Sequence, residues 1–179
     1  MTDTEIRNLT ENSGLNADTL QNTLVETLTE RGLKIATAES CTGGLVSERI
    51  TSVSGASGVF DCGICSYANK IKEKLLGVSS ETLKTLGAVS AETAVQMAEG
   101  VRRLAGADIG ISTTGIAGPT GGTPQKPVGT VFVGVSTEKS SFAGRLNLGG
   151  ENADNSREYI RKSASDAALL LAINEIGKL

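Results

Sequence analysis

Hydrophobic and polar positions along the chain alternate in blocks that predict helices and strands in turn. Leucines spaced four residues apart between residues 18 and 31 mark one face of a helix, and Gly32 is placed to end it. Short, mostly apolar stretches at 33–38 and 108–113 have the length of buried strands. A third run, 59–67, also predicts a strand, although a glycine interrupts it.

The rest of the chain continues this alternation. Helices are predicted at 45–50, 70–76, 80–86, 90–104 and 155–176. Two β-rich runs, 128–136 and 141–148, are joined by a short polar turn and predict a β-hairpin. Capping boxes at Asp18–Gln21 and Asn155–Glu158 are expected to open the first and last helices.

This order of elements predicts an α/β fold. Strands that alternate with helices form a largely parallel sheet covered on both faces, and the hairpin adds one antiparallel strand to it. No internal repeat or linker divides the chain, so residues 18–179 are expected to form a single domain. The polar residues 1–17 carry no period and are expected to be flexible.

Composition narrows the partners that this domain can have. Only 3% of the 179 residues are aromatic and the net charge is -3, which argues against nucleic acid and membrane surfaces as partners. The longest apolar stretch, 167–173, is far shorter than the ~20 residues of a membrane span. The first residues do not resemble a signal peptide, and three cysteines make no disulfide-rich pattern. We therefore expect a soluble, cytoplasmic protein.

Histidine is absent from the sequence, and this excludes several kinds of catalytic site. A Ser-His-Asp triad, a Cys-His pair and any zinc site that uses histidine are impossible. A general base must instead be Lys, Asp, Glu, Tyr or Cys. Among these, a lysine shielded from water is the natural base for a serine nucleophile.

The first candidate segment, residues 38–44, follows a predicted strand and precedes a helix. Ser40, Cys41 and Thr42 place two hydroxyls and a thiol at the carboxyl edge of the sheet, where open α/β folds bind ligands. Free N–H groups at the helix start favour an anion or a developing oxyanion. The alternative is that Ser40 or Thr42 simply caps that helix.

The second candidate segment, residues 67–72, follows the next predicted strand. Tyr67, Asn69 and two lysines lie at another turn from strand to helix, and either lysine is a candidate base. The alternative is a charged first helical turn in which Lys70 and Lys72 only face water. Composition alone does not choose between these alternatives.

The third candidate segment, residues 113–123, is a loop after a strand. Five of its eleven residues are tiny, which lets backbone N–H groups approach a phosphate closely: Gly115, Ala117, Gly118, Gly121 and Gly122. It is not a Walker loop, because no Gly-Lys-Ser/Thr sequence ends it. The alternative is a flexible connecting loop, although its length favours a function.

Two further motifs are expected to be coincidental. Cys62 and Cys65 form a C-x-x-C pair, but three cysteines without histidine do not complete a four-ligand zinc site, and the pair lies within a predicted strand. Ser136 and Lys139 match the S-x-x-K pattern of penicillin-binding proteins, but they lie at the hairpin turn and are expected to face solvent.

Three motifs occur in a fixed order along the chain. They are AESCTGG at 38–44, Tyr67-Ala68-Asn69 with Lys72, and TGIAGP at 114–119 followed by TPQKPVG at 123–129. Together they resemble the C-terminal domain of the CinA competence-damage proteins, over residues 18–177. The resemblance implies a three-layer α/β/α sandwich with a mixed, mostly parallel five-stranded sheet. Larger members carry an additional N-terminal domain, for which this chain is expected to have no room.

The resemblance also implies an activity, that of the family's stand-alone form, which deamidates nicotinamide mononucleotide to nicotinate mononucleotide and ammonia. It implies that Ser40 is the nucleophile, Lys72 its base and Tyr67 a supporting hydroxyl. Substrate contacts are then expected at nine positions: Thr42, Gly43, Gly44, Asn69, Thr114, Gly115, Ala117, Gly118 and Gly121.

Within this set, N–H groups near Thr42 and Gly43 are expected to hold the oxyanion, and the 115–123 loop the phosphate. No metal and no cofactor are expected. The expected partner is a small-molecule nucleotide substrate, not nucleic acid or a membrane, and we expect a homo-oligomer.

The chain departs from the family pattern in two places. Cys62 stands where the family usually has a glycine, and Asn155-Ser156-Arg157 stands where it usually has a Gly-Asp-Arg-like turn. The second departure leaves open a homologue that binds a nucleotide without hydrolysing it. A further alternative is a redox-sensing or anion-binding module that uses Cys62 and Cys65.

Overall fold

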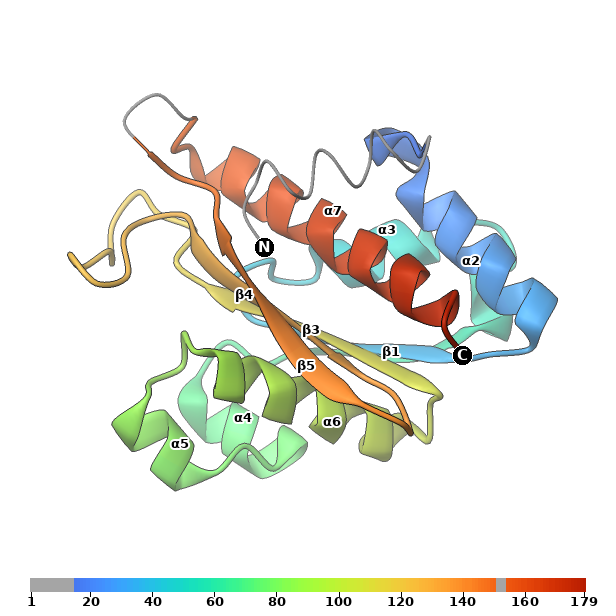
Figure 1. The fold of residues 1–179 in the computed structure, drawn as a ribbon, viewed down its shortest axis with the longest axis horizontal. Coiled ribbons are helices and arrows are strands. Elements are labelled where there is room, and N and C mark those ends of the chain that lie inside the picture. The colour runs from blue at the N-terminus through green and yellow to red at the C-terminus, as the bar shows by residue number, and fades with distance from the viewer. Residues whose placement is uncertain (1–14, 151–153) are drawn as a thin grey trace.

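A five-stranded sheet lies between two layers of helices (Figure 1). The computed structural model describes residues 15–150 and 154–179. Its strands are β1 (Ile35–Glu39), β2 (Phe60–Cys65), β3 (Ile109–Gly115), β4 (Thr130–Ser136) and β5 (Ser141–Asn147). Its helices are α2 (Leu20–Arg31), α3 (Leu45–Thr51), α4 (Asn69–Leu76), α5 (Ser80–Thr85), α6 (Ala91–Ala105) and α7 (Arg157–Ile176), with short 3-10 helices η1 (Ala17–Thr19) and η2 (Ala56–Gly58). The predicted α/β class is confirmed.

The strand order brings the carboxyl ends of three parallel strands to one edge. The order is β2-β1-β3-β4-β5, and β1 runs parallel to both of its neighbours. As predicted from the hairpin, β4 runs against β3 and β5. At the end of β1, Glu39 is paired with Cys65 of β2 and with Thr113 of β3. The three candidate segments, which follow these strands, therefore meet at this edge.

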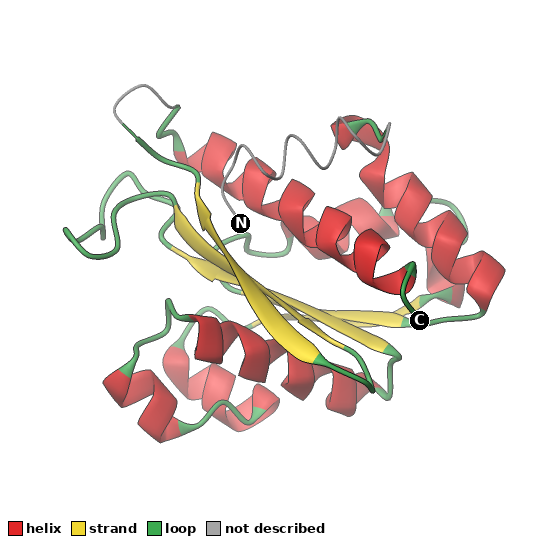
Figure 2. Cartoon of the chain, in the orientation of Figure 1, coloured by secondary structure: helices red, strands yellow, loops and turns green. Residues whose placement is uncertain are grey.

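Each face of the sheet is covered by its own helices. Figure 2 shows helices on both sides of the strands, with α2, α3 and α7 on one face and α4, α5 and α6 on the other. Successive side chains of a strand point to opposite faces, so Ile35 packs into the core on the α7 side, whereas Ala36 and Ala38 pack against the α6 side. The expected three-layer sandwich is present.

The starts of the first and last helices differ from the prediction. Asn16, not Asp18, caps the short helix η1, because its side chain accepts a hydrogen bond from the N–H of Asp18, and α2 itself begins without a side-chain cap. The hydroxyl of Ser156 caps α7, and the Asn155 side chain instead bonds the backbone of Gly150. Both caps lie one or two residues from the predicted position, a shift that hydrophobic periodicity does not resolve.

Two other boundaries also bear on the predictions. β2 ends at Cys65, so Tyr67 lies beyond the strand rather than within it. Of the segment 1–17 that was expected to be flexible, residues 1–14 lie outside the described residues, and Ala17 already begins η1. None of the described helices combines the length and the apolar character needed to cross a membrane.

Helix α6 lies close to the sheet because glycines face it. A Cβ atom added to Gly110 of β3 would collide with the carbonyl oxygen of Ala98, and one added to Gly134 of β4 would collide with that of Ala94. Neither glycine has a positive φ. Their role is therefore to leave room for the helix backbone, not to turn the chain.

We expect Gly110→Ala to destabilise the protein by roughly 1–3 kcal/mol, because the added methyl group forces α6 and β3 apart in a packed interior. Gly58→Ala is the matched control, since nothing lies within 4 Å of its added Cβ and its φ is not positive. Urea unfolding of both variants and the wild type measures the difference. Equal losses in the two variants would show that α6 does not need this space.

Candidate active site

The side chains of Ser40 and Lys72 meet at the carboxyl edge of the sheet. Ser40 directly follows β1, and its backbone N–H donates to the carbonyl of Thr113, 2.9 Å away, which holds it beside β3. Lys72 lies in the first turn of α4, and its Nζ donates to Ser40 Oγ at 3.0 Å. The structure thus places the predicted nucleophile and the predicted base in hydrogen-bond contact.

Lys72 is buried without a carboxylate partner among the described residues. It is 1% exposed, and its Nζ makes its second hydrogen bond to the carbonyl of Ser66 at 2.6 Å. Burial lowers the pKa of Lys72 from its ordinary value, and the neighbouring Cys41 opposes this shift only in part. A lowered pKa makes the neutral amine more accessible, and the neutral amine is the form that can act as a base.

Cys41 is poorly suited to nucleophilic attack although it is the neighbour of Ser40. Its side chain is buried, and burial raises the pKa of its thiol to about 12. Such a thiol stays protonated near neutral pH, whereas the thiolate is the nucleophilic form of cysteine. Within residues 38–44, Ser40 is therefore the better candidate for a nucleophile, because its Oγ contacts the Nζ of Lys72.

Glu39 fills the start of helix α3. Its buried carboxylate accepts hydrogen bonds of 2.8–3.0 Å from three backbone N–H groups, those of Gly44, Val46 and Ser47. It also accepts from the hydroxyls of Thr42 and Ser47, each at 2.6 Å. The expectation that this helix start is open to a substrate anion is therefore wrong, because the protein's own carboxylate occupies it.

Two further residues, Thr113 and Arg161, hold the turn after Ser40 through hydrogen bonds to Thr42. The Thr42 hydroxyl donates to Glu39, so it accepts at 2.7 Å from the hydroxyl of Thr113. The Thr42 carbonyl accepts two hydrogen bonds from the guanidinium of Arg161, at 2.7 and 3.1 Å. The side chain and carbonyl of Thr42 are thus committed to the turn, and Thr42 is fully buried.

A cavity of about 220 Å³ opens beside Ser40 and Lys72. Its walls come from the ends of β1, β2 and β3, from α4, from the loop before α6 and from the start of α7: Ser40, Cys41, Tyr67, Lys72, Ala88, Val89, Thr114, Gly115, Ala117 and Arg157. Parts of all three predicted segments therefore line one pocket, as the parallel strand order requires.

Arg157 joins Tyr67 to the glycine-rich loop at this cavity. Its Nη2 donates to the Tyr67 hydroxyl oxygen at 2.9 Å, and its Nη1 donates to the carbonyl of Gly118 at 3.0 Å. Tyr67 is 64% exposed. Because its oxygen accepts from Arg157, its own O–H proton is left to donate to a ligand. Sequence reasoning named Arg157 only as part of a departing turn and missed this contact.

Of the nine predicted substrate-binding residues, three line the cavity, namely Thr114, Gly115 and Ala117. The other six do not: Thr42, Gly43, Gly44, Asn69, Gly118 and Gly121. Asn69 is exposed at the start of α4, and Gly121 is exposed in the outer part of the loop. The Gly44 N–H is bound to Glu39. Thr114 does line the cavity, but its hydroxyl donates to the carbonyl of Ala88 at 2.6 Å. Substrate contacts at all nine positions stay a prediction.

Ala88 and Val89 form a wall of the cavity that sequence reasoning missed. Lys126 holds this wall, since its Nζ donates to the carbonyls of Leu86 and Val89 at 2.9 and 2.6 Å. Small apolar residues in a loop carry no local signal for a pocket. The lysine within the 123–129 motif was the one available sign, and its contacts depend on the folded chain.

The two motifs expected to be coincidental do not line the cavity. Cys62 is partly buried on the α6 side of β2 and Cys65 is exposed, because residues three apart in a strand point to opposite faces. Both are free thiols. Ser136 was expected to face solvent, and this is wrong: it is fully buried at the end of β4, and its hydroxyl bonds Arg102 and Ser141.

Comparison with known proteins identifies the family of this chain. The family model of the CinA C-terminal domain matches residues 17–176 of this chain. A CinA-like protein of Kosmotoga olearia is 50% identical over 156 residues, which make up 87% of this chain and 37% of that protein. The chain spans about a third of the length of the curated relatives that it matches.

Solved structures show the same fold. The competence/damage inducible protein CihA from Agrobacterium tumefaciens superposes with a TM-score of 0.82 at 39% identity, over 88% of this chain and 95% of that one. A CinA superfamily protein from Klebsiella pneumoniae superposes with a TM-score of 0.84 at 29% identity, over 92% and 99% of the two chains. By sequence and by fold, the chain belongs to the CinA C-terminal domain family.

Proposed function

We propose that this chain hydrolyses the carboxamide of nicotinamide mononucleotide, releasing nicotinate mononucleotide and ammonia. The observation that carries the proposal is the 3.0 Å contact between Ser40 Oγ and the buried Nζ of Lys72 beside a pocket. The CinA family includes amidase members, which supports the reaction class. The nucleotide itself is proposed from the resemblance of the three ordered motifs.

The first chemical step is attack of Ser40 on the carboxamide carbon. Neutral Lys72 takes the hydroxyl proton as Ser40 Oγ bonds to that carbon, and the carbonyl oxygen becomes an oxyanion. Lys72 is then an ammonium that hydrogen-bonds the carbonyl of Ser66. Since no carboxylate among the described residues stabilises this ammonium, it is a ready proton donor for the next step.

The second step expels ammonia and then frees the enzyme. Lys72 returns its proton to the departing nitrogen as the C–N bond breaks, which leaves an ester between Ser40 and the nicotinoyl group. A water molecule then attacks the ester, with Lys72 again accepting a proton. Cleavage restores the Ser40 hydroxyl and releases the carboxylic acid product.

The oxyanion needs hydrogen-bond donors close to Ser40. We assign this role to the backbone N–H groups of Gly43, which is exposed, and of its buried neighbour Thr42, because within the described part of the chain neither N–H donates to another protein group. Glu39 and Arg161 hold the turn that carries them. Donors that are fixed before the reaction stabilise developing charge without reorganising, which is the property an oxyanion site requires.

Ammonia release tests the proposed function directly. The purified protein is incubated with nicotinamide mononucleotide, and ammonia and nicotinate mononucleotide are both quantified. Formation of the two in equal amounts supports the proposal. Binding of the nucleotide without ammonia would instead support a homologue that binds and does not hydrolyse.

We expect Ser40→Ala to lower kcat by on the order of 10³-fold or more, because the covalent nucleophile is lost. Cys41→Ala is the matched control, since the buried, protonated thiol takes no part in the proposed chemistry, and its effect should be mild. Ammonia release measures both, and circular dichroism checks that both variants fold. An inactive Cys41→Ala beside an active Ser40→Ala would mean that the thiol is the nucleophile.

We expect activity to rise with pH and then level off, because Lys72 acts as a base only when it is neutral. Burial lowers its pKa, so the rise should be centred below the value of about 10.4 of an ordinary lysine. Lys72→Arg should be inactive, since a guanidinium does not lose its proton. The exposed Lys70 provides the control, and Lys70→Ala should keep the wild-type profile of kcat/KM against pH. Substantial activity in Lys72→Arg would mean that Lys72 supplies only a positive charge and is not the base.

A further inference from the structure

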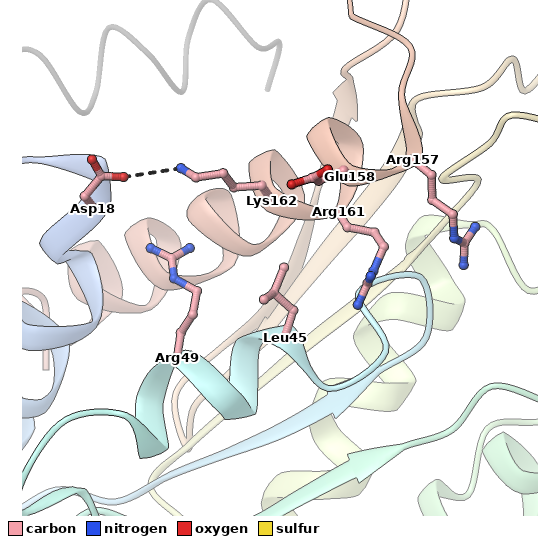
Figure 3. Close-up of a pocket in the computed structure, with 7 residues that line it drawn as sticks. All are labelled: Asp18, Leu45, Arg49, Arg157, Glu158, Arg161 and Lys162. Carbon is pink, nitrogen blue, oxygen red and sulfur yellow. Dashed lines mark ion pairs between the residues drawn. The ribbon is translucent and has the colours of Figure 1, made fainter.

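A second, larger cavity adjoins the candidate active site and shares Arg157 with it. Its volume is about 680 Å³. Figure 3 shows it between helices α3 and α7 and the short helix η1, which carries Asp18. Four cationic side chains line the cavity: Arg49, Arg157, Arg161 and Lys162. The other lining residues are Leu45 and the carboxylates Asp18 and Glu158. The cavity therefore offers more positive than negative charge.

Two of the four cations are neutralised by carboxylates of the protein. Arg49 forms an ion pair with Asp166 at 2.6 Å. Lys162 pairs with Asp166 at 3.4 Å and with Asp18 at 3.5 Å. In Figure 3 the Lys162 side chain extends away from Arg161 towards Asp18. These two side chains fasten α7 to its neighbours and leave little charge for a ligand.

Arg157 and Arg161 lack such partners. They lie four residues apart at the start of α7, hence on one face of the helix, where like charges repel. Arg157 donates to a phenol oxygen and a carbonyl, and Arg161 donates only to a carbonyl. In the described part of the chain neither forms an ion pair, although Glu158 lines the same cavity.

The unused donors of these arginines match a phosphate. A guanidinium has five N–H donors, and each of these two arginines uses two of them. Its planar fork binds phosphate oxygens through paired hydrogen bonds. A dianionic phosphomonoester would also relieve the repulsion between the two arginines, which no carboxylate of the described chain does.

The size of the smaller cavity also indicates that a nucleotide needs the space of the larger cavity. About 220 Å³ is less than the roughly 300–1,000 Å³ of pockets that bury a drug-sized ligand. An aromatic carboxamide that reaches Ser40 leaves little room there for a ribose and a phosphate. The larger cavity offers this room, and Arg157 is the residue that the two cavities share.

We propose that the larger cavity is the phosphate subsite of the active site, with Arg161 and Arg157 as the ligands of a substrate phosphomonoester. That the phosphate belongs to a nicotinamide nucleotide rests on the proposed function, whereas the affinity for a phosphomonoester rests on the arginines. Arg161 also holds the Thr42 carbonyl, so the subsite and the turn that carries Ser40 form one unit. The proposed phosphate site therefore lies on α7 and not, as expected from the sequence, in the 115–123 loop.

Binding of ribose 5-phosphate, which has no carboxamide, tests the subsite independently of catalysis. Calorimetry compares the wild type with Arg161→Gln and with the control Arg103→Gln, whose arginine is exposed on α6 outside both cavities. We expect Arg161→Gln to weaken binding roughly 10- to 100-fold, the effect of losing hydrogen bonds to a charged group. Arg103→Gln should bind like the wild type.

Kinetics then separate phosphate binding from a merely structural role of Arg161. The measured quantity is the ratio of kcat/KM for nicotinamide mononucleotide to that for nicotinamide riboside, which lacks the phosphate. A disturbed Thr42 turn lowers both values and leaves the ratio unchanged, whereas loss of a phosphate ligand lowers the ratio. We expect a fall of roughly 10-fold or more in Arg161→Gln and none in Arg103→Gln.

The possible results distinguish the subsite from the function. Ribose 5-phosphate that binds the wild type and not Arg161→Gln supports the subsite, even if no ammonia is released from any nucleotide. Ammonia release with an unchanged ratio in Arg161→Gln overturns the subsite and leaves the function in place. Failure of the wild type to bind ribose 5-phosphate also overturns it.

Discussion

The candidate site depends on the buried carboxylate of Glu39. Five hydrogen bonds reach it from the first turn of α3 and from two hydroxyls, so a charge that is costly to bury alone is fully satisfied. These bonds tie the end of β1 to the start of α3, and Ser40 lies in the connection between them. Ser40 therefore lies on a turn that hydrogen bonds to a buried carboxylate hold in place.

The hydrogen bonding of the Glu39 carboxylate also affects the protonation of Lys72. Because the Glu39 oxygens are bonded to α3, Lys72 is left with a hydroxyl and a carbonyl as partners, and burial lowers its pKa. The same burial raises the pKa of the Cys41 thiol. Burial thus favours the neutral form of both groups. The neutral amine is the form of Lys72 that the proposed reaction needs, whereas the neutral thiol of Cys41 is a poor nucleophile.

Helix α7 completes the site from the other end of the chain. Arg157 connects Tyr67 to the carbonyl of Gly118, and Arg161 connects α7 to the Thr42 carbonyl. The first turns of α7 therefore contact all three loops that follow the parallel strands. Two arginines without carboxylate partners in the described chain are a natural place for an anionic ligand.

The sequence by itself determined the α/β class, the order of the elements, the single reversed strand and the segments that carry Ser40, Tyr67 and Lys72. These follow from hydrophobic periodicity and from the rule that ligands bind at the carboxyl ends of parallel strands. Only the tertiary structure decided that Glu39 fills the start of α3, that Ser136 is buried and that Arg157 and Arg161 bond the loops of the site. Local patterns encode which face of an element is buried. Which donor meets which acceptor is decided by competition between groups far apart in the chain, once folding has removed the water that would otherwise satisfy them.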